Sequence, residues 1–174
     1  MYWEEVIELI KTHNDDVVSE YPNPLNDGDY ITYEYERGTV KSSYIHINEF
    51  PEKIKDVLKP YLKYGITDLQ IFSSLGPSEG IGIHNDPTGV LILCLEGEIA
   101  YIVEKFKGAT AEDEHIKNDP VILRQGDTIF IQNGLQHAAV SSKVPRICIS
   151  CAVDGIIPRE EVTFYTWQIL NISL

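Results

Sequence analysis

Short apolar segments separated by turn residues dominate the chain from residue 66 to residue 153. Most of them are rich in β-branched or aromatic residues, and glycine, proline, asparagine and aspartate punctuate them, a pattern typical of β-strands. The predicted strands are 69–73, 81–84, 90–95, 99–103, 121–123, 128–131, 138–140 and 146–153. About eight short strands joined by tight turns predict a mostly β fold, either a jelly roll or a barrel.

The N-terminal third has a different periodicity. Apolar residues recur at helical spacing over residues 2–13 and again over 51–64, which predicts two amphipathic helices. Pro51 stands at the start of the second helix and Gly65 is placed to cap its C-terminus. Further strands are predicted at 30–35 and 44–47, and residues 162–170 predict one more strand or a helix.

The length of the chain suits one folding unit. A chain of 174 residues, 43% of them hydrophobic, is large enough to bury a core. We therefore expect a single domain over residues 1–174. Residues 66–174 would form its β core, and two or three helices with strands from residues 1–65 would pack on the outside.

The overall charge of the chain is strongly negative, with a net charge of -13 and a pI of about 4.7. An acidic surface repels the phosphates of nucleic acids and of anionic membranes, so neither is expected as a partner. The first residues lack a basic segment followed by an apolar one, and no stretch reaches the roughly 18 apolar residues of a membrane span. These features predict a cytoplasmic protein.

Cys94, Cys148 and Cys151 all lie within apolar segments. An odd number of cysteines in such segments predicts buried free thiols in a reducing compartment. Cys148 and Cys151 would point to opposite faces of one strand, so they could not grip one metal ion together.

Two segments contain residues that could bind a metal ion. In a strand, residues i and i+2 point the same way, so His84 and Asp86 could both face into a barrel. His137 follows a Gly-Asp turn, a buried strand and a glycine turn. Two imidazoles and one carboxylate form the facial triad of non-haem Fe(II) oxygenases, with positions left open for substrate. A His-x-Asp pair alone is common by chance, and His137 could be a hydrogen-bonded core histidine, but the pairing favours an Fe(II) site.

The segment from Gly126 to His137 resembles the second conserved motif of cupins, Gly-x5-Pro-x-Gly-x2-His, with Gln132 in place of the proline. His84-x-Asp86, followed by an apolar strand and a Glu-Gly turn, resembles the corresponding part of JmjC-type and related cupin dioxygenases. The resemblance covers roughly residues 66–153. It implies a double-stranded β-helix, a cupin-like jelly roll, with Fe(II) as cofactor and 2-oxoglutarate as co-substrate.

A 2-oxoglutarate enzyme needs a cation, or an equivalent set of donors, for the distal carboxylate of the co-substrate. JmjC-type hydroxylases place a lysine on the strand after the Glu-Gly turn, where this chain has Ile99. Prolyl-hydroxylase-like enzymes place an arginine or lysine on the strand after the second metal histidine, and Arg146 lies nine residues after His137. An inward guanidinium there could bind a carboxylate with two hydrogen bonds, although Arg146 could also be a strand-edge residue that points to solvent.

Other residues could assist in binding the co-substrate. Lys105 is a weaker substitute for Arg146, and Tyr101 and Thr128 could add hydrogen bonds.

The sequence thus favours an Fe(II)- and 2-oxoglutarate-dependent dioxygenase that hydroxylates a small molecule or a protein side chain. Two alternatives stay open. One is a metal-binding cupin that does not use 2-oxoglutarate, such as another dioxygenase, an isomerase or a lyase, which Ile99 favours. The other is a non-catalytic binding module that kept the fold. Since cupin-like domains often pair through added N-terminal elements, a homodimer is also an expectation.

Overall fold

The computed structural model describes residues 2–12, 32–34, 39–41, 44–74, 76, 82–103, 120–140 and 143–166. Its elements in chain order are α1 (Trp3–Thr12), β1 (Thr32–Glu34), β2 (Thr39–Lys41), β3 (Ile45–His46), the 3₁₀ helix η2 (Ile47–Glu49), α2 (Glu52–Leu58), the 3₁₀ helix η3 (Lys59–Tyr64), β4 (Asp68–Ser74), β5 (Gly89–Glu96), β6 (Glu98–Val103), β7 (Val121–Arg124), β8 (Thr128–Ile131), β9 (His137–Ala139), β10 (Arg146–Val153), the 3₁₀ helix η5 (Arg159–Glu161) and β11 (Phe164–Thr166).

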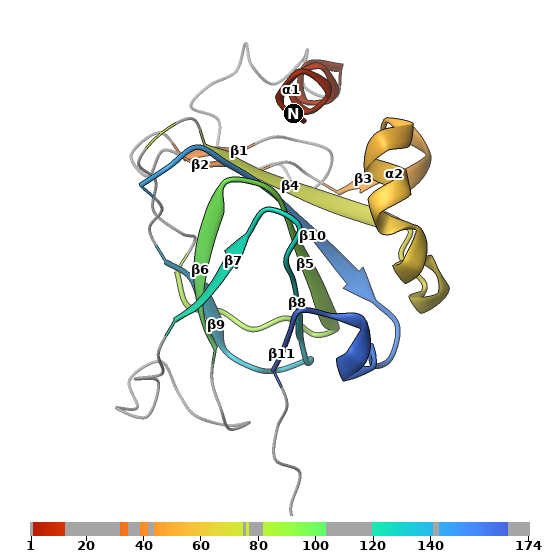
Figure 1. The fold of residues 1–174 in the computed structure, drawn as a ribbon, viewed down its shortest axis with the longest axis vertical. Coiled ribbons are helices and arrows are strands. Elements are labelled where there is room, and N and C mark those ends of the chain that lie inside the picture. The colour runs from red at the N-terminus through yellow and green to blue at the C-terminus, as the bar shows by residue number, and fades with distance from the viewer. Residues whose placement is uncertain are drawn as a thin grey trace, which may run out of the picture.

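The strands form two sheets that curve around a shared interior (Figure 1). The larger sheet has the order β1-β2-β4-β10-β5-β8-β11, with β3 paired to β4, and the smaller has the order β7-β6-β9. The described pairs are antiparallel except for β11 and β8, which run parallel. Neighbours such as β4 and β10 are far apart in the sequence, so non-local pairing of short strands builds the jelly roll.

Two hydrophobic layers lie on the two faces of the larger sheet. Strand β5 contributes to both layers because alternate residues of a strand point to opposite faces. Its Leu91, Leu93 and Leu95 belong to an outer layer with residues of α1 and α2, and its Val90, Ile92 and Cys94 belong to an inner layer with residues of β6, β7 and β8. Figure 1 shows both α-helices beside β4, away from the smaller sheet. The helices therefore cover the outer face, as predicted.

Most predicted elements match the structure, but the helix predicted over 51–64 is interrupted. It is α-helical only over Glu52–Leu58 and continues as the 3₁₀ helix η3, with Pro60 in its first turn. Proline has no N–H to donate and its ring collides with the preceding turn, so the α-helix ends before it. Gly65 caps η3 with a φ of 75° and donates its N–H to Leu62 O, as predicted.

The prediction of a strand over 81–84 is wrong for its described residues, 82–84. Residues 82–88 are irregular, apart from an isolated bridge at His84, and Gly82 has a φ of 87° that a strand does not contain. In the segment 162–170, β11 is a strand over Phe164–Thr166, and residues 167–170 lie outside the described part. In the described part of the chain, no helix is long and apolar enough to cross a membrane.

Candidate metal centre

Backbone hydrogen bonds tie together the two segments that carry the predicted metal ligands. His84 and His137 form a reciprocal pair, in which the N–H of His84 donates to His137 O at 3.0 Å and the N–H of His137 donates to His84 O at 2.8 Å. The N–H of Gly134 donates to Asp86 O at 2.8 Å. The backbone of the irregular segment 82–88 is therefore held against the start of β9 without belonging to a strand.

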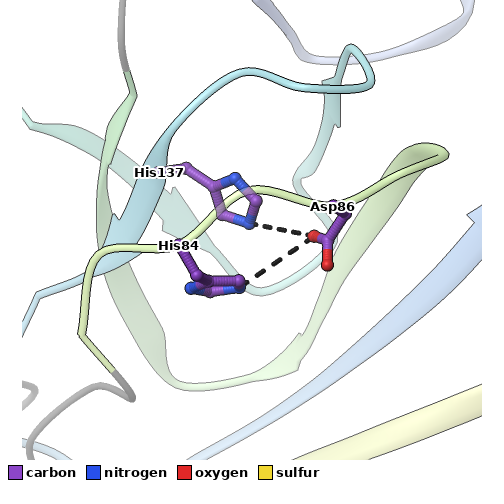
Figure 2. Close-up of side chains that lie close together, drawn as sticks. All are labelled: His84, Asp86 and His137. Carbon is purple, nitrogen blue, oxygen red and sulfur yellow. Dashed lines mark ion pairs between the residues drawn. The ribbon is translucent and has the colours of Figure 1, made fainter. Parts of the chain in front are cut away.

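The structure brings the side chains of His84, Asp86 and His137 together, as Figure 2 shows. One ligand atom from each residue lies within 4.8 Å of the other two. Asp86 Oδ2 is 3.3 Å from His137 Nε2 and 4.0 Å from His84 Nε2, and the two imidazole rings lie 4.3 Å apart between centroids. His137 is buried, whereas His84 and Asp86 are about one-third exposed, with side-chain exposures of 35% and 33%.

The hydrogen bond made by Nδ1 of each imidazole determines whether Nε2 has a lone pair for a metal ion. Nδ1 of His84 lies 3.0 Å from Gly82 O, and Nδ1 of His137 lies 3.0 Å from Leu135 O. A carbonyl oxygen only accepts, so each Nδ1 must be the donor, and the neutral ring then has its lone pair on Nε2. Backbone partners of this kind orient histidines that bind metals.

The three side chains bring acceptor atoms together. With the proton on Nδ1, the Nε2 atoms are acceptors that face a carboxylate oxygen, another acceptor, at 3.3 and 4.0 Å. A metal ion bound between them would accept a lone pair from each of the three atoms. Two imidazole nitrogens and one carboxylate oxygen within 4.8 Å of one another are a ligand set suited to a divalent transition metal. The donor set therefore fits a metal ion.

A cavity of about 390 Å³ adjoins the three side chains. Its lining comes from both sheets and from the irregular segment, and consists of Tyr44, Gln70, Phe72, His84, Asp86, Pro87, Thr88, Val90, Ile92, Tyr101, His137, Ala139, Arg146, Ser150 and Ala152. Among the lining residues, Tyr44 is exposed, whereas Arg146 is only 1% exposed. The volume is within the range of pockets that bind small molecules.

Strand parity explains why Arg146 points inward. Along β10, Arg146, Ser150 and Ala152 line the cavity, whereas the alternating residues Ile147 and Ile149 belong to the outer hydrophobic layer. Tyr101 of β6 also lines the cavity and is buried, and burial raises the pKa of its phenol far above its usual value. A neutral phenol can donate a hydrogen bond, so Tyr101 adds a donor to the cavity wall that contains the guanidinium of Arg146.

Thr128, which was also predicted to bind the co-substrate, is not among the residues that line the cavity. The Oγ1 of Thr128 accepts a hydrogen bond from the N–H of Thr163 at 3.1 Å, and Thr163 Oγ1 accepts one from the N–H of Thr128 at 3.1 Å. Thr128 thus joins β8 to the segment before β11, and the structure does not place it at the cavity. Lys105 lies outside the described residues.

Several cavity residues were not singled out from the sequence. Gln70 and Phe72 lie on β4, in register with Ser150 and Cys148 of β10. Parity with Arg146 could have identified Ser150, but Gln70 and Phe72 depend on a pairing between strands about 80 residues apart, which no local pattern encodes. Tyr44 stands at the start of the strand predicted at 44–47, and it is 56% exposed beside the cavity. Partial burial, followed by the nearby charge of Asp86, raises the pKa of its phenol.

Gly97, in the turn between β5 and β6, positions the start of β10. Its φ is 74°, and a Cβ at this position would lie 2.0 Å from Pro145 O and 3.1 Å from the Cα of Arg146. We expect Gly97→Ala to lower the free energy of unfolding by about 2–5 kcal/mol, because left-handed strain adds to the backbone collision. Urea denaturation would measure the loss.

Gly155→Ala is the matched control, because Gly155 has a φ of 85° but no atom within 4 Å of the added Cβ. The free energy of unfolding of Gly155→Ala should fall by only about 1–2 kcal/mol, from left-handed backbone strain alone. Equal losses in the two variants would show that the contact with Pro145 and Arg146 is unimportant.

No protein-family profile matches this sequence, and no curated protein sequence matches it significantly. Solved structures of the Escherichia coli ribosomal oxygenase YcfD are similar. One aligns with a TM-score of 0.56 and 22% identity over 76% of this chain and 37% of that chain. A complex with cobalt and 2-oxoglutarate aligns with a TM-score of 0.54 and 22% identity over 71% of this chain and 33% of that chain. A complex with cobalt and succinic acid aligns with a TM-score of 0.52 and 21% identity over 74% of this chain and 36% of that chain.

These similarities establish the fold. Together with the strand order of the two sheets, they show a double-stranded β-helix, the fold that the sequence predicted. This chain spans little more than a third of the length of YcfD.

Proposed function

We propose that this protein is an Fe(II)- and 2-oxoglutarate-dependent oxygenase that hydroxylates a small molecule or a protein side chain. One observation carries the proposal. A cavity has the cluster of His84, Asp86 and His137 in its wall, and the buried Arg146 lies in the same wall. A metal site and a cation for a dicarboxylate in one cavity are what this chemistry requires. The similarity to an oxygenase solved with cobalt and 2-oxoglutarate supports the proposal.

In this proposal, His84 and His137 bind Fe(II) through Nε2 and Asp86 binds it through a carboxylate oxygen. Three protein ligands would leave further coordination positions of the ion for the co-substrate and dioxygen. Bound Fe(II), together with 2-oxoglutarate and dioxygen, supplies the oxidising power for hydroxylation of a C–H bond. The protein contributes orientation, because Gly82 O and Leu135 O hold the rings and the bond from Gly134 holds the backbone of Asp86.

Arg146 and Tyr101 are the proposed site for the distal carboxylate of 2-oxoglutarate. A guanidinium presents a planar fork of donors that matches a carboxylate, and a charged hydrogen bond is strong where water is excluded. Val90, Ile92 and Phe72 supply apolar wall to the same cavity. The position where JmjC-type enzymes have a lysine is Ile99, which is buried in the inner hydrophobic layer. The anchor in this protein is therefore an arginine from β10.

Uncoupled turnover tests the proposal without knowledge of the substrate. The protein would be incubated in air with Fe(II) and 2-oxoglutarate, and succinate would be measured over time. We expect slow formation of succinate that requires Fe(II) and is absent in Asp86→Ala. No succinate, together with no binding of 2-oxoglutarate by calorimetry, would contradict the proposal.

Other outcomes would select the alternatives. If the protein binds a metal ion and turns over a substrate without requiring 2-oxoglutarate, it is a different metal-dependent cupin. Protein purified without a chelator that contains no metal, and that keeps its thermal stability in His84→Ala, would indicate a non-catalytic binding module.

A further inference from the structure

We propose that Cys94 and Cys148 form a redox-active thiol pair, which a peroxide converts to a disulfide between β5 and β10. The pair lies in the inner hydrophobic layer, and neither residue is among the candidate metal ligands. All three cysteines are free thiols in the structure. The inference does not depend on the proposed oxygenase function.

The two cysteines face each other across antiparallel strands. Cys148 is the register partner of Cys94, and both side chains belong to the inner layer. The N–H of Cys94 donates to Asp127 O at 3.0 Å, and its C=O accepts from the N–H of Gly126 at 2.8 Å. Because both backbone groups of Cys94 point toward the β8 side, its pairing with Cys148 is of the non-hydrogen-bonded type.

This type of pairing brings side chains close. Opposite Cα atoms in a non-hydrogen-bonded antiparallel pair lie about 4.5 Å apart. Disulfides span Cα separations of about 4.4–6.8 Å, so the backbone can accept the bond with little rearrangement. The register between β10 and β5 shifts next to this pair, because Ile147 pairs with Glu96 and Cys148 with Cys94.

Cys151 provides an internal contrast. It lies on the same strand as Cys148, but its side chain belongs to the outer layer, on the opposite face of the sheet. Its register partners are Leu69 and Leu91. Burial raises the pKa of the Cys151 thiol above its usual value. Cys151 is therefore an unreactive thiol with no cysteine opposite to it.

The surroundings assign different roles to the two thiols. The Sγ of Cys94 lies 3.4 Å from Glu96 O and 3.5 Å from Gly97 O, and both oxygens can accept a hydrogen bond from its S–H. A hydrogen bond with Cys148, followed by burial, raises the pKa of Cys94. The same hydrogen bond lowers the pKa of Cys148, burial opposes this change, and the charge of Arg146 adds to it. Carbonyl oxygens beside Cys94 disfavour its thiolate, whereas the nearby guanidinium favours that of Cys148, so we assign Cys148 as the attacking thiol and Cys94 as the resolving one.

Hydrogen peroxide is the two-electron oxidant that converts the two thiols to a disulfide. The Cys148 thiolate attacks one oxygen of the peroxide, the O–O bond breaks, and hydroxide leaves and takes up a proton to form water. The product is a sulfenic acid on Cys148. The Cys94 sulfur then attacks this sulfur, and the hydroxyl group leaves as a second water with the proton from Cys94. Two thiols lose two electrons in total and one peroxide gains them.

Access favours a small oxidant. Cys148 is fully buried and Cys94 is 1% exposed, so bulky thiol reagents should react slowly with the folded protein. Arg146 lines the cavity and lies two residues before Cys148 along β10, so we expect a small oxidant to approach the pair from the cavity side.

The test is thiol mapping of the full chain. Reduced protein, with a chelator present to prevent metal-driven radical chemistry, is treated with hydrogen peroxide, denatured in an alkylating agent and analysed by mass spectrometry. We expect loss of two hydrogen masses, a peptide that joins Cys94 to Cys148, an alkylated Cys151 and full reversal by dithiothreitol. Peroxide should cause the same change in Cys151→Ser.

Cys94→Ser and Cys148→Ser should each abolish the disulfide, with folding checked by circular dichroism. The map of the wild-type protein decides the matter even if one of these variants fails to fold. Three alkylated cysteines after peroxide treatment, a disulfide that includes Cys151, or Cys148 oxidised beyond sulfenic acid without a disulfide would overturn the proposal.

Discussion

Replacing His137 with alanine is expected to lower the affinity for Fe(II) by more than about 100-fold, since loss of an outer-shell partner alone costs about 10–100-fold. His137 Nε2 is the candidate ligand nearest to the Asp86 carboxylate, at 3.3 Å, and its ring is buried and oriented by Leu135 O. Succinate formation should disappear with the metal. Anaerobic calorimetry with Fe(II) measures the affinity directly.

Two controls separate this effect from general damage. His46 is an exposed histidine that accepts a hydrogen bond from the N–H of Asn48, and His46→Ala should bind Fe(II) like the wild type. His84 is more exposed than His137, so His84→Ala should lose the metal with less risk to folding. If the folded His84→Ala and His137→Ala proteins both bind Fe(II) with wild-type affinity, the metal site is not at these residues.

The second large effect is expected at Arg146. Arg146→Met keeps a long apolar side chain but removes the charge, and truncating one partner of a buried charged pair costs about 2–5 kcal/mol, which is roughly 30-fold or more in affinity. The dissociation constant of 2-oxoglutarate should rise by at least that factor, while Fe(II) affinity stays unchanged. The dissociation constant of 2-oxoglutarate for Arg146→Lys should lie between those of the wild type and Arg146→Met, because an ammonium keeps the charge without the planar arrangement of donors.

Lys105→Met is the matched control for this experiment, since Lys105 was the weaker alternative in the sequence. It should leave the affinity for 2-oxoglutarate unchanged. A loss in Lys105→Met with none in Arg146→Met would transfer the anchor to Lys105 and contradict the role given to Arg146.

Local patterns predicted the strands of the β core well. The bounds of β8 and β10 agree with the sequence prediction, because β8 is buried along its whole length and β10 alternates between two hydrophobic layers. The helix over 51–64 was predicted as continuous because the apolar spacing continues past Pro60, whereas the proline converts the second half to a 3₁₀ helix. Spacing alone does not reveal this change.

The candidate site was predicted in part for the wrong reason. His84 and Asp86 were placed on one face by the parity of a strand, but they lie in an irregular segment held by backbone hydrogen bonds from His137 and Gly134. The inward direction of Arg146 follows from parity along β10. The remaining walls could not be predicted, because Phe72 and Gln70 reach the cavity through the pairing of β4 with β10, a contact between distant parts of the chain.

The most direct test of the metal and co-substrate site is optical. Fe(II) and 2-oxoglutarate would be added to the protein without oxygen, and the visible spectrum recorded before and after addition. The account predicts a weak charge-transfer band in the wild type that requires both additions and is absent in His137→Ala. A wild-type protein that shows no band, and that binds no 2-oxoglutarate by calorimetry when loaded with Fe(II), would contradict it.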